Sequence, residues 1–589
     1  MRGGIFWKKG PKNEMRRVRT RYHTSQCKIT VVARYLAISQ MPHASIYYHP
    51  EGYVTSGQRI MGRQAAGESF LRAAAQSGAS HLTCHTDNAG SAQHFSEQLA
   101  KYGFAGQARW VPMEQPQGLA EDGCLYLPGP NLKDSAWHRA PVGARAYSLC
   151  GITHTTASHL ATSSITDLLT APVRSWDALI CTSTAVRDTV RTLLQNQAQY
   201  LREQIGATRF ELPQLPIIPL GVHCADFAFS AQDRNEGRRS LGVGADEIVV
   251  LFVGRLAFHA KAHPQQMFTA LERAARSFPD KRIRLVQCGW YANEHIEAAF
   301  NDAARALCPS VVLQHADGRD PAARRHAWAA ADIFMSLSDN IQETFGLTPI
   351  EAMAAGLPVI VSDWDGYKDT VRDGMDGFRI PTVMPQAGSG IDLAGRYANG
   401  TDTYDFHCGF ASQFVALDAK ALDEALKKLI ADPQLRRQMG ESGRKRAIVE
   451  YEWAVIYRRY QTLWDELAER RRADPDLHPP VGITARPDRP DPFAAFAGYA
   501  TTQIGMRHIV TLRQEGSELA LRRALALNAF AQKLQPDAEA CAAIVGFLSE
   551  RGPQPVASIA ELFPGTPVWQ LQRGLVWLAK MEVLQIDVL

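Results

Sequence analysis

Residues 342–369, QETFGLTPIEAMAAGLPVIVSDWDGYKD, contain the clearest sign of the fold, because they read as a loop, a helix and a buried strand in succession. Residues 348–355 predict a helix, since a proline is tolerated in the first turn and Gly356 can take a positive φ where the helix ends. Residues 357–361, LPVIV, are apolar on both faces, which is typical of a parallel strand covered on both sides. The stretch therefore indicates an α/β unit.

The same stretch places two carboxylates beside the start of a helix. Glu343 lies in the preceding loop and Glu351 within the helix, so both can face one ligand site. The peptide N–H groups of Phe345–Leu347 lie at the helix N-terminus, where unpaired donors and the helix dipole favour an anion. Carboxylates repel phosphate but accept hydrogen bonds from hydroxyl groups. An anion site beside two carboxylates therefore suits a nucleotide sugar, which carries both a diphosphate and hydroxyl groups. An ordinary crossover with two solvated glutamates is the alternative.

The rest of the chain repeats this alternation of strands and helices in two halves. Strand candidates of the first half begin at Ala44 and recur at 80–86, 178–183 and 215–227. Those of the second half lie at 247–256, 283–289, 310–316 and 331–338. The pattern predicts an α/β protein with two doubly wound Rossmann-like domains, residues 41–230 and 231–450, which face each other across a cleft. Residues 383–408 interrupt it with a Gly-rich polar stretch, and a helix over 451–473 is expected to return to the first domain.

The bulk composition narrows the class of protein. The 589 residues are too many for one domain, and 46% hydrophobic with 21% charged residues is typical of a globular chain. No apolar run reaches eighteen residues, so we expect no membrane-spanning helix. The ten cysteines include no C-x-x-C pair, which favours a reduced set over a disulfide framework or a zinc site. We expect a cytoplasmic protein, with peripheral attachment to the inner face of a membrane as an alternative.

The first 40 residues differ in charge from the rest. They contain ten Lys and Arg against one acid, Glu14, a balance of +9, which leaves −5 for the remaining chain because the formal total is +4. Three interpretations stay open: a basic arm for nucleic acid or membrane, a targeting peptide, or translated upstream sequence before a working start near Met41. We favour the third and expect residues 1–40 to lie outside the fold.

The end of the chain has the composition of a linker followed by a small module. Six prolines between 475 and 492 predict a linker over 474–492. Residues 493–589 read as a mainly helical module that resembles a winged-helix domain. From 491 onward, eight basic residues stand against nine acids, and the helix expected over 567–580 carries only Arg573 and Lys580. We therefore expect no binding to nucleic acid, but docking onto a protein partner or a second copy.

A second cluster of candidate residues follows the first strand of the second half. In FVGRLAFHAKAHP, Arg255 and Lys261 lie in the loop after the carboxyl end of that strand, the edge at which open α/β sheets bind ligands. An Arg fork and a Lys point charge suit a diphosphate and can stabilise charge that builds on a leaving group. Taken alone, these two residues could equally belong to an ordinary solvated loop. The helix start near residue 346, which follows a strand of the same predicted sheet, favours a ligand site.

These motifs together resemble a known family. Glu343-Thr-Phe-Gly-(x)4-Glu351, followed by AMAAGLPVI, closely resembles the E-x7-E signature of retaining GT-B glycosyltransferases of family 4, the group 1 glycosyltransferases. The segments GRL with Lys261, PLGVHCADF, ICTSTAVRD and DGMDGF look like further landmarks of that family. The resemblance covers roughly residues 44–470.

The resemblance implies roles for individual residues. Arg255 and Lys261 would hold the donor diphosphate, Glu343 the hydroxyls of the transferred sugar and Glu351 the ribose. His154, at the end of a predicted strand, resembles the histidine that these enzymes point at the transferred sugar. The segment Gly52-Tyr53-(x)3-Gly57 resembles the family's first glycine loop, which approaches the diphosphate or the acceptor. The implied catalytic residues are His154, Glu343, Arg255 and Lys261, and the implied donor-binding residues are Gly254, Arg255, Lys261, Glu343, Thr344, Phe345, Gly346, Leu347 and Glu351.

By this resemblance, a sugar moves from a nucleotide donor to a glycan, lipid-linked or small-molecule acceptor with retention of anomeric configuration, in glycan or polysaccharide biosynthesis. The route is front-face, with the departing diphosphate helping to deprotonate the acceptor. No metal or other cofactor is expected, because no D-x-D-like or His-rich cluster occurs and Arg255 with Lys261 can take the role of a metal. The alternatives are a GT-B-fold epimerase or phosphorylase-like enzyme, or a degenerate nucleotide-sugar-binding protein that regulates through its tail.

Overall fold

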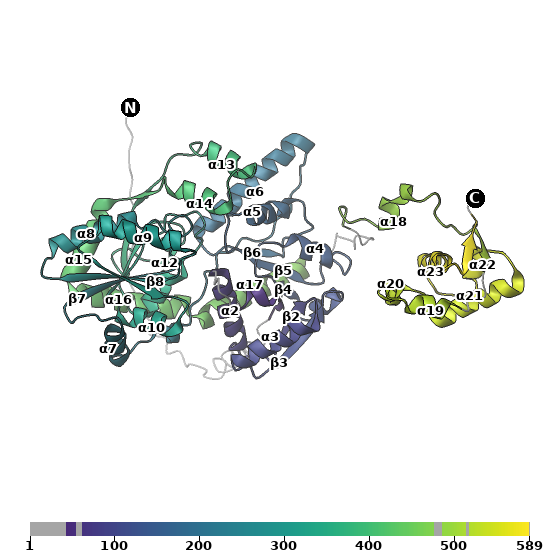
Figure 1. The fold of residues 1–589 in the computed structure, drawn as a ribbon, viewed down its shortest axis with the longest axis horizontal. Helices are drawn as coiled ribbons and strands as arrows, with labels where there is room; N and C mark the ends of the chain where they lie inside the picture. Colours follow the sequence, from purple (N-terminus) through teal and green to yellow (C-terminus); the bar gives the residue numbers. More distant parts are fainter. Residues whose placement is uncertain (1–42, 55–61, 476–485, 514–517, 588–589) are drawn as a thin grey trace, which may run out of the picture. The chain divides into compact units, whose positions relative to one another are not determined.

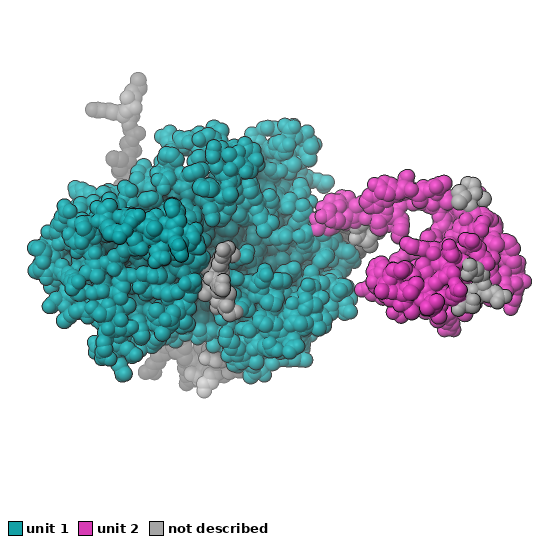
Figure 2. Space-filling view, in the orientation of Figure 1, with its two compact units in different colours: residues 1–484 teal, residues 485–589 magenta. Residues whose placement is uncertain are grey.

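The chain folds into two compact units. The computed structural model describes residues 43–54, 62–475, 486–513 and 518–587, and the units divide between Thr484 and Ala485 (Figure 2). The first unit contains two parallel β-sheets with their helices (Figure 1), and the second contains the C-terminal module. The predicted extension over 1–40 lies outside the described residues.

The first sheet has six parallel strands in the order β3-β2-β1-β4-β5-β6. Its strands are β1 (Ser45–Tyr47), β2 (His81–Thr86), β3 (Gln107–Pro112), β4 (Cys124–Tyr126), β5 (Ser148–Ile152) and β6 (Ala178–Ile180). The main helices around it are α2 (Gly62–Ala75), α3 (Ala89–Lys101), α4 (Lys133–Arg139), α5 (His159–Thr166) and α6 (Thr184–Ile205). Strands β5 and β6 are buried at every position, as expected for a sheet covered on both faces.

The second sheet repeats the same topology, in the order β12-β11-β10-β7-β8-β9. Its strands are β7 (Glu247–Val253), β8 (Arg282–Gly289), β9 (Val312–Asp317), β10 (Ile333–Ser336), β11 (Val359–Ser362) and β12 (Gly377–Ile380). Its helices are α7 (Ala231–Ser240), α8 (Gln265–Ser277), α9 (Glu294–Leu307), α10 (Pro321–Ala330), α11 (Leu347–Ala354), α12 (Tyr367–Thr370), α15 (Ala419–Ala431) and α16 (Pro433–Arg446). Both sheets have the strand order of a Rossmann fold, which confirms the prediction of two doubly wound domains.

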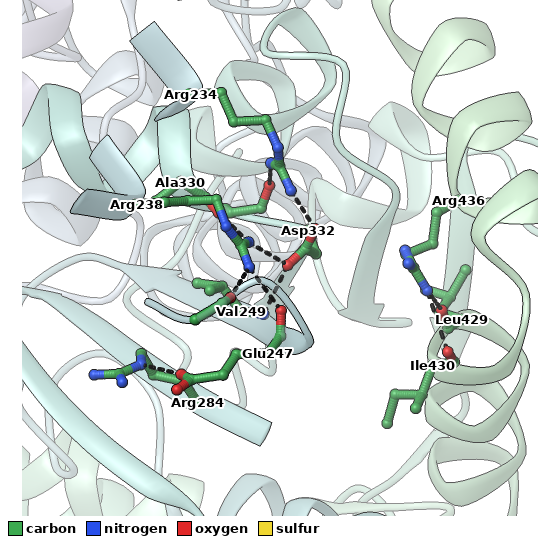
Figure 3. Close-up of polar contacts among 12 residues, drawn as sticks. Arg234, Arg238, Glu247, Val249, Arg284, Ala330, Asp332, Leu429, Ile430 and Arg436 are labelled. Carbon is green, nitrogen blue, oxygen red and sulfur yellow. Dashed lines mark hydrogen bonds and ion pairs between the residues drawn. The ribbon is translucent and has the colours of Figure 1, made fainter. Parts of the chain in front are cut away.

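Charged residues at the amino ends of the second sheet's strands already have partners (Figure 3). Asp332, before β10, accepts hydrogen bonds from Arg234 Nη2 at 2.6 Å and Arg238 Nη1 at 3.2 Å, which fasten α7 to the sheet. Glu247, at the start of β7, accepts from Arg284 Nε at 2.7 Å. These contacts make this edge of the sheet a structural ion network.

A long helix late in the first unit, α17 (Trp453–Ala473), lies against α2 and β5 of the first domain. Trp453 Nε1 donates to Ser69 Oγ, and Arg471 Nη1 donates to Gly123 O and to Ser148 Oγ. The chain thus ends its second Rossmann-like domain and crosses back to the first.

The polar stretch after Thr382 forms a closed excursion from the second domain. Strands β13 (Thr382–Val383) and β14 (Ala416–Leu417) pair antiparallel at its base, and the excursion between them contains α13 (Ile391–Ala398) and α14 (Tyr404–Ser412). Tyr397 of α13 contacts His159 at the start of α5, and Tyr404 of α14 contacts Thr155 just before it (Figure 1). What reads in the sequence as a polar insertion is therefore ordered and helical.

The second unit has a three-stranded antiparallel sheet in the order β16-β15-β17. Its elements are α18 (Pro492–Ala495), β15 (Ile509–Leu512), α19 (Leu519–Ala524), α20 (Ala526–Ala529), α21 (Ala538–Arg551), β16 (Gln554–Pro555), α22 (Val556–Ala560), α23 (Val568–Lys580) and β17 (Leu584–Ile586). Buried apolar residues of β15, α21, α22 and α23 form its own core. The winged-helix assignment and the docking role stay predictions. Across the described ranges of the whole chain, no helix is long and apolar enough to cross a membrane.

Candidate active site

The predicted donor-binding residues gather where the strand order of the second sheet reverses. Strands β7 and β10 are neighbours at the centre of that sheet, although two strands and three helices lie between them along the chain. Arg255 and Lys261 follow the carboxyl end of β7, and Glu343 follows that of β10. This switch point is the place where open α/β sheets bind ligands.

Lys261 and Glu343 form an ion pair with each other. Lys261 Nζ donates to Glu343 Oε2, and both side chains are largely buried. Burial lowers the pKa of the Lys261 ammonium, but the Glu343 carboxylate outweighs it, so that the pKa lies above its ordinary value. Lys261 is therefore a charged donor held in place before any ligand arrives. A diphosphate that binds here must share or replace the Glu343 carboxylate as its partner.

Glu351 forms no ion pair of this kind within the described residues. It lies in α11 and its side-chain oxygens accept no hydrogen bond from the part of the chain that the structure describes. Burial raises its pKa to about 7, although Arg324 and Lys261 each lower it. The residue is only part-buried, so its carboxylate remains accessible and is suited to take hydroxyl donors from a ligand.

The start of α11 presents free peptide donors beside this pair of glutamates. Gly346 caps the helix with φ +83°, and a Cβ there would come within 1.9 Å of the Tyr367 ring, so only glycine fits. The ring of Phe345 is buried in the core, which fixes the loop. Within the described residues, the N–H groups of Phe345, Gly346 and Leu347 donate to no acceptor, so they remain available to an anion.

The first domain contacts this loop directly. Thr344 Oγ1 donates to His154 O at 3.2 Å, and Ser183 Oγ donates to Thr344 O at 2.9 Å. His154 is part-buried, and this burial, with the nearby Arg63, lowers the pKa of its imidazole to about 4. His154 is therefore neutral near pH 7 and can accept or donate one hydrogen bond without carrying charge. The structure brings it to the same loop as Glu343.

The segment predicted as a glycine loop is only partly described by the structure, and its tyrosine belongs to the core. Gly52 lies close to α2, because a Cβ on Gly67 would come within 2.1 Å of its carbonyl oxygen. The Tyr53 side chain is fully buried, and its hydroxyl donates to Tyr47 O at 3.0 Å, so it serves the core and is not free to contact a ligand. Gly57 lies outside the described residues.

Sequence reasoning missed a contact that the excursion makes beside this site. The His159 N–H donates to Tyr397 Oη at 3.0 Å, and their rings stack with centroids 3.8 Å apart. The Tyr404 hydroxyl lies 3.2 Å from Thr155 Oγ1, next to His154. The excursion thus joins the second domain to the β5–α5 loop of the first. Aromatic residues in a stretch of low hydropathy were the only signal for it.

No metal site stands out. In the ranges that the structure describes, no three His, Cys, Asp or Glu side chains lie close enough together to hold a metal ion. The cations at the site are Arg255 and Lys261. Arg255 is partly exposed and donates from Nη2 to Ala260 O at 3.1 Å.

Comparison with known proteins finds a family similarity within the second domain. Residues 233–389 match the family model of glycosyl transferases group 1. The D-inositol 3-phosphate glycosyltransferase of Corynebacterium kroppenstedtii is 32% identical over 145 residues, 24% of this chain and 31% of the relative. The alpha-maltose-1-phosphate synthase of Mycolicibacterium smegmatis is 29% identical over 222 residues, 37% of this chain and 47% of the relative. The chain therefore spans a third to a half of these curated relatives.

Among solved structures, that of Anabaena HepE in complex with UDP and glucose is 15% identical, covers 72% of this chain and 100% of its own, and has a TM-score of 0.47. The matched family region contains Gly254, Arg255, Lys261 and the whole segment 343–351. The chain thus has two Rossmann-like sheets, and its second half is similar over residues 233–389 to the glycosyl transferases of group 1.

Proposed function

We propose that the protein transfers a sugar from a nucleotide-sugar donor to an acceptor hydroxyl with retention of anomeric configuration. The observation that carries the proposal is the combination at the sheet's switch point. A charged lysine, free peptide donors and the part-buried Glu351 carboxylate lie together there, and they match the diphosphate and the hydroxyls of one ligand. The family match over this segment and the names of the relatives support the same reaction class.

The proposed mechanism assigns each group a task that does not require a covalent enzyme intermediate. The bond between the anomeric carbon and the diphosphate breaks, and the charge that builds on the leaving oxygen is stabilised by Lys261, Arg255 and the α11 N–H groups. The acceptor oxygen attacks from the same face, and its proton passes to the departing diphosphate. Glu343 and neutral His154 hold the transferred sugar, and Glu351 holds the ribose.

The acceptor side belongs to the first domain in this proposal. His154 and Thr155 follow β5 of that domain, and the excursion through α13 and α14 closes against the same loop. The acceptor, a glycan, a lipid-linked precursor or a small molecule, would enter between them. Incubation with a nucleotide sugar and candidate acceptors, followed by NMR of the anomeric proton, tests retention. A product with inverted configuration would contradict it.

Glu351→Gln is expected to weaken binding of the free nucleotide about tenfold, because the ribose hydroxyls lose a charged acceptor while the shape is kept. The effect should depend on pH. Burial raises the pKa of Glu351 to about 7, although Arg324 and Lys261 lower it. The carboxylate therefore becomes protonated as the pH drops from 8 to 6, and the affinity of the wild type for the nucleotide should fall. The variant should lack that dependence. Calorimetry across this range measures both.

The exposed Glu424 on α15 provides a matched control for this change. Glu424→Gln should leave nucleotide affinity and its pH dependence unaltered. If Glu351→Gln bound the free nucleotide as well as the wild type at pH 8, the ribose would have to be assigned elsewhere.

A further inference from the structure

The turn after β11 contains a residue in an unfavourable backbone conformation beside the candidate site. Asp365 has φ +43°, and among the described residues only Glu582 shares a positive φ without being glycine. The left-handed region disfavours side chains with a Cβ, and such residues concentrate at functional sites. Glycine would be the default here, so the aspartate needs an explanation of its own.

Packing around the turn explains the positive φ of Asp365 but does not explain why the residue carries a carboxylate. A Cβ on the next residue, Gly366, would come within 2.5 Å of Phe345 Cα. Tyr367 follows, fully buried, with its hydroxyl 2.9 Å from Ser336 Oγ and its ring against Gly346. The turn is thus pressed between the 343–346 loop and the core, which fixes φ at Asp365. Glycine would meet this requirement at lower cost.

The Asp365 carboxylate itself is poorly satisfied. Oδ1 accepts one long hydrogen bond, from Ser183 Oγ of the first domain at 3.4 Å. Oδ2 is buried and has no hydrogen-bond partner among the described residues. The charged groups facing it are the carboxylates of Glu343 and Asp369, and burial together with these acids raises the pKa of Asp365 to about 8, although the Gly366 N–H and the Ser183 hydroxyl act in the opposite direction. Within the part of the chain that the structure describes, no cation pairs with this carboxylate, whereas a buried acid with a purely structural role normally has such a partner.

We propose that Asp365 is a further specificity-determining residue of this site, which binds a hydroxyl group of a bound sugar. Its neighbours define the place: Glu343, assigned to the transferred sugar, lies on one side, and Ser183 of the first domain on the other. A sugar hydroxyl both donates and accepts, so it can satisfy this carboxyl group in either protonation state. The proposal rests on the proposed function and adds a sugar contact in the turn after β11.

The hydroxyl can come from the donor or from the acceptor, and two variants of Asp365 distinguish these sources. Asp365→Asn keeps size and tolerates a positive φ, whereas Asp365→Gly also removes the backbone strain. The full chain is titrated with UDP and UDP-glucose, or with GDP and GDP-mannose if the unmodified protein prefers that pair. Acceptor KM is measured with D-inositol 3-phosphate, the compound in the name of one relative.

If the hydroxyl belongs to the donor, both variants should bind the nucleotide sugar at least tenfold more weakly than the wild type does. Their affinity for the free diphosphate should stay within twofold of the wild-type value. For an acceptor hydroxyl, donor affinity should stay constant while acceptor KM rises at least tenfold. In either case Asp365→Gly should keep or raise the melting temperature, because strain and a buried carboxyl are removed.

A lower melting temperature in Asp365→Gly, with sugar affinity and acceptor KM unchanged in Asp365→Asn, would overturn the proposal and make the residue structural. Failure of the unmodified protein to bind any diphosphate or nucleotide sugar would instead remove the proposed function on which it rests. The two failures are therefore distinct.

Discussion

Lys261→Ala is expected to weaken the binding of both the nucleoside diphosphate and its sugar conjugate by about ten- to hundredfold. A charge-assisted hydrogen bond is worth about 1.5–3 kcal/mol, and each 1.36 kcal/mol is a factor of about ten. The lysine is enclosed and already charged next to Glu343, so little reorganisation is needed before it contacts phosphate. Arg255→Ala, which removes the partly exposed neighbour, should have an effect of the same sign. Calorimetry with the diphosphate measures both.

The control is Lys427→Ala, because Lys427 is exposed on α15 of the same domain. It should bind the diphosphate like the wild type. Unchanged affinity in a folded Lys261→Ala protein would remove Lys261 from the site, and loss of affinity in Lys427→Ala would point to a general charge effect.

Glu343→Gln is expected to separate catalysis from nucleotide binding. Turnover should fall by about ten- to hundredfold, because the transferred sugar loses a charged acceptor and Lys261 loses the partner that orients it. Affinity for the free diphosphate should stay the same or rise, because the carboxylate that competes for Lys261 is gone. Glu351→Gln, in contrast, should weaken diphosphate binding.

Steady-state turnover and calorimetry on the same preparation of each variant measure this separation. Equal losses of turnover in the two glutamate variants, with neither binding the free nucleotide less well, would contradict the division of roles between Glu343 and Glu351.

The sequence predicts the fold well because the central strands of the sheets are buried on both faces, whereas the edge strands β3 and β9 are partly exposed. The run LPVIV and the segment 247–256 appear as β11 and β7, and the strand order of both domains follows the Rossmann pattern. The position of Arg255 and Glu343 at one edge follows from the rule that parallel strands carry ligand residues at their carboxyl ends. Periodicity and known topology therefore suffice to place these loops together.

Side-chain partners are less accessible from sequence. The pairing of Lys261 with Glu343 joins residues 82 positions apart, and it depends on the lengths of two loops that no local pattern encodes. Tyr53 lies in a segment with the glycines of a ligand loop, yet its ring goes to the core, where it stacks on Tyr48 at 5.0 Å. Which way a loop side chain points is decided by the tertiary packing around it.

Two further features depend on contacts between the domains. The excursion through α13 and α14 is Gly-rich and polar in sequence, but Tyr397 and Tyr404 contact residues of the β5–α5 loop more than two hundred positions away. The strain at Asp365 arises because Phe345 and Tyr367 hold the turn from both sides. Neither the reach of an insertion nor a positive φ at an aspartate follows from composition.

The binding of a nucleotide sugar at the β7 and β10 loops is tested most directly by calorimetric titration of the unmodified full chain with UDP-, GDP- and ADP-sugars. We expect one nucleotide series to bind without added metal, with the free diphosphate of the same series also binding and Lys261→Ala losing at least tenfold in affinity for both. Absence of binding across all three series, or equal binding by the wild type and Lys261→Ala, would contradict the assignment of this site.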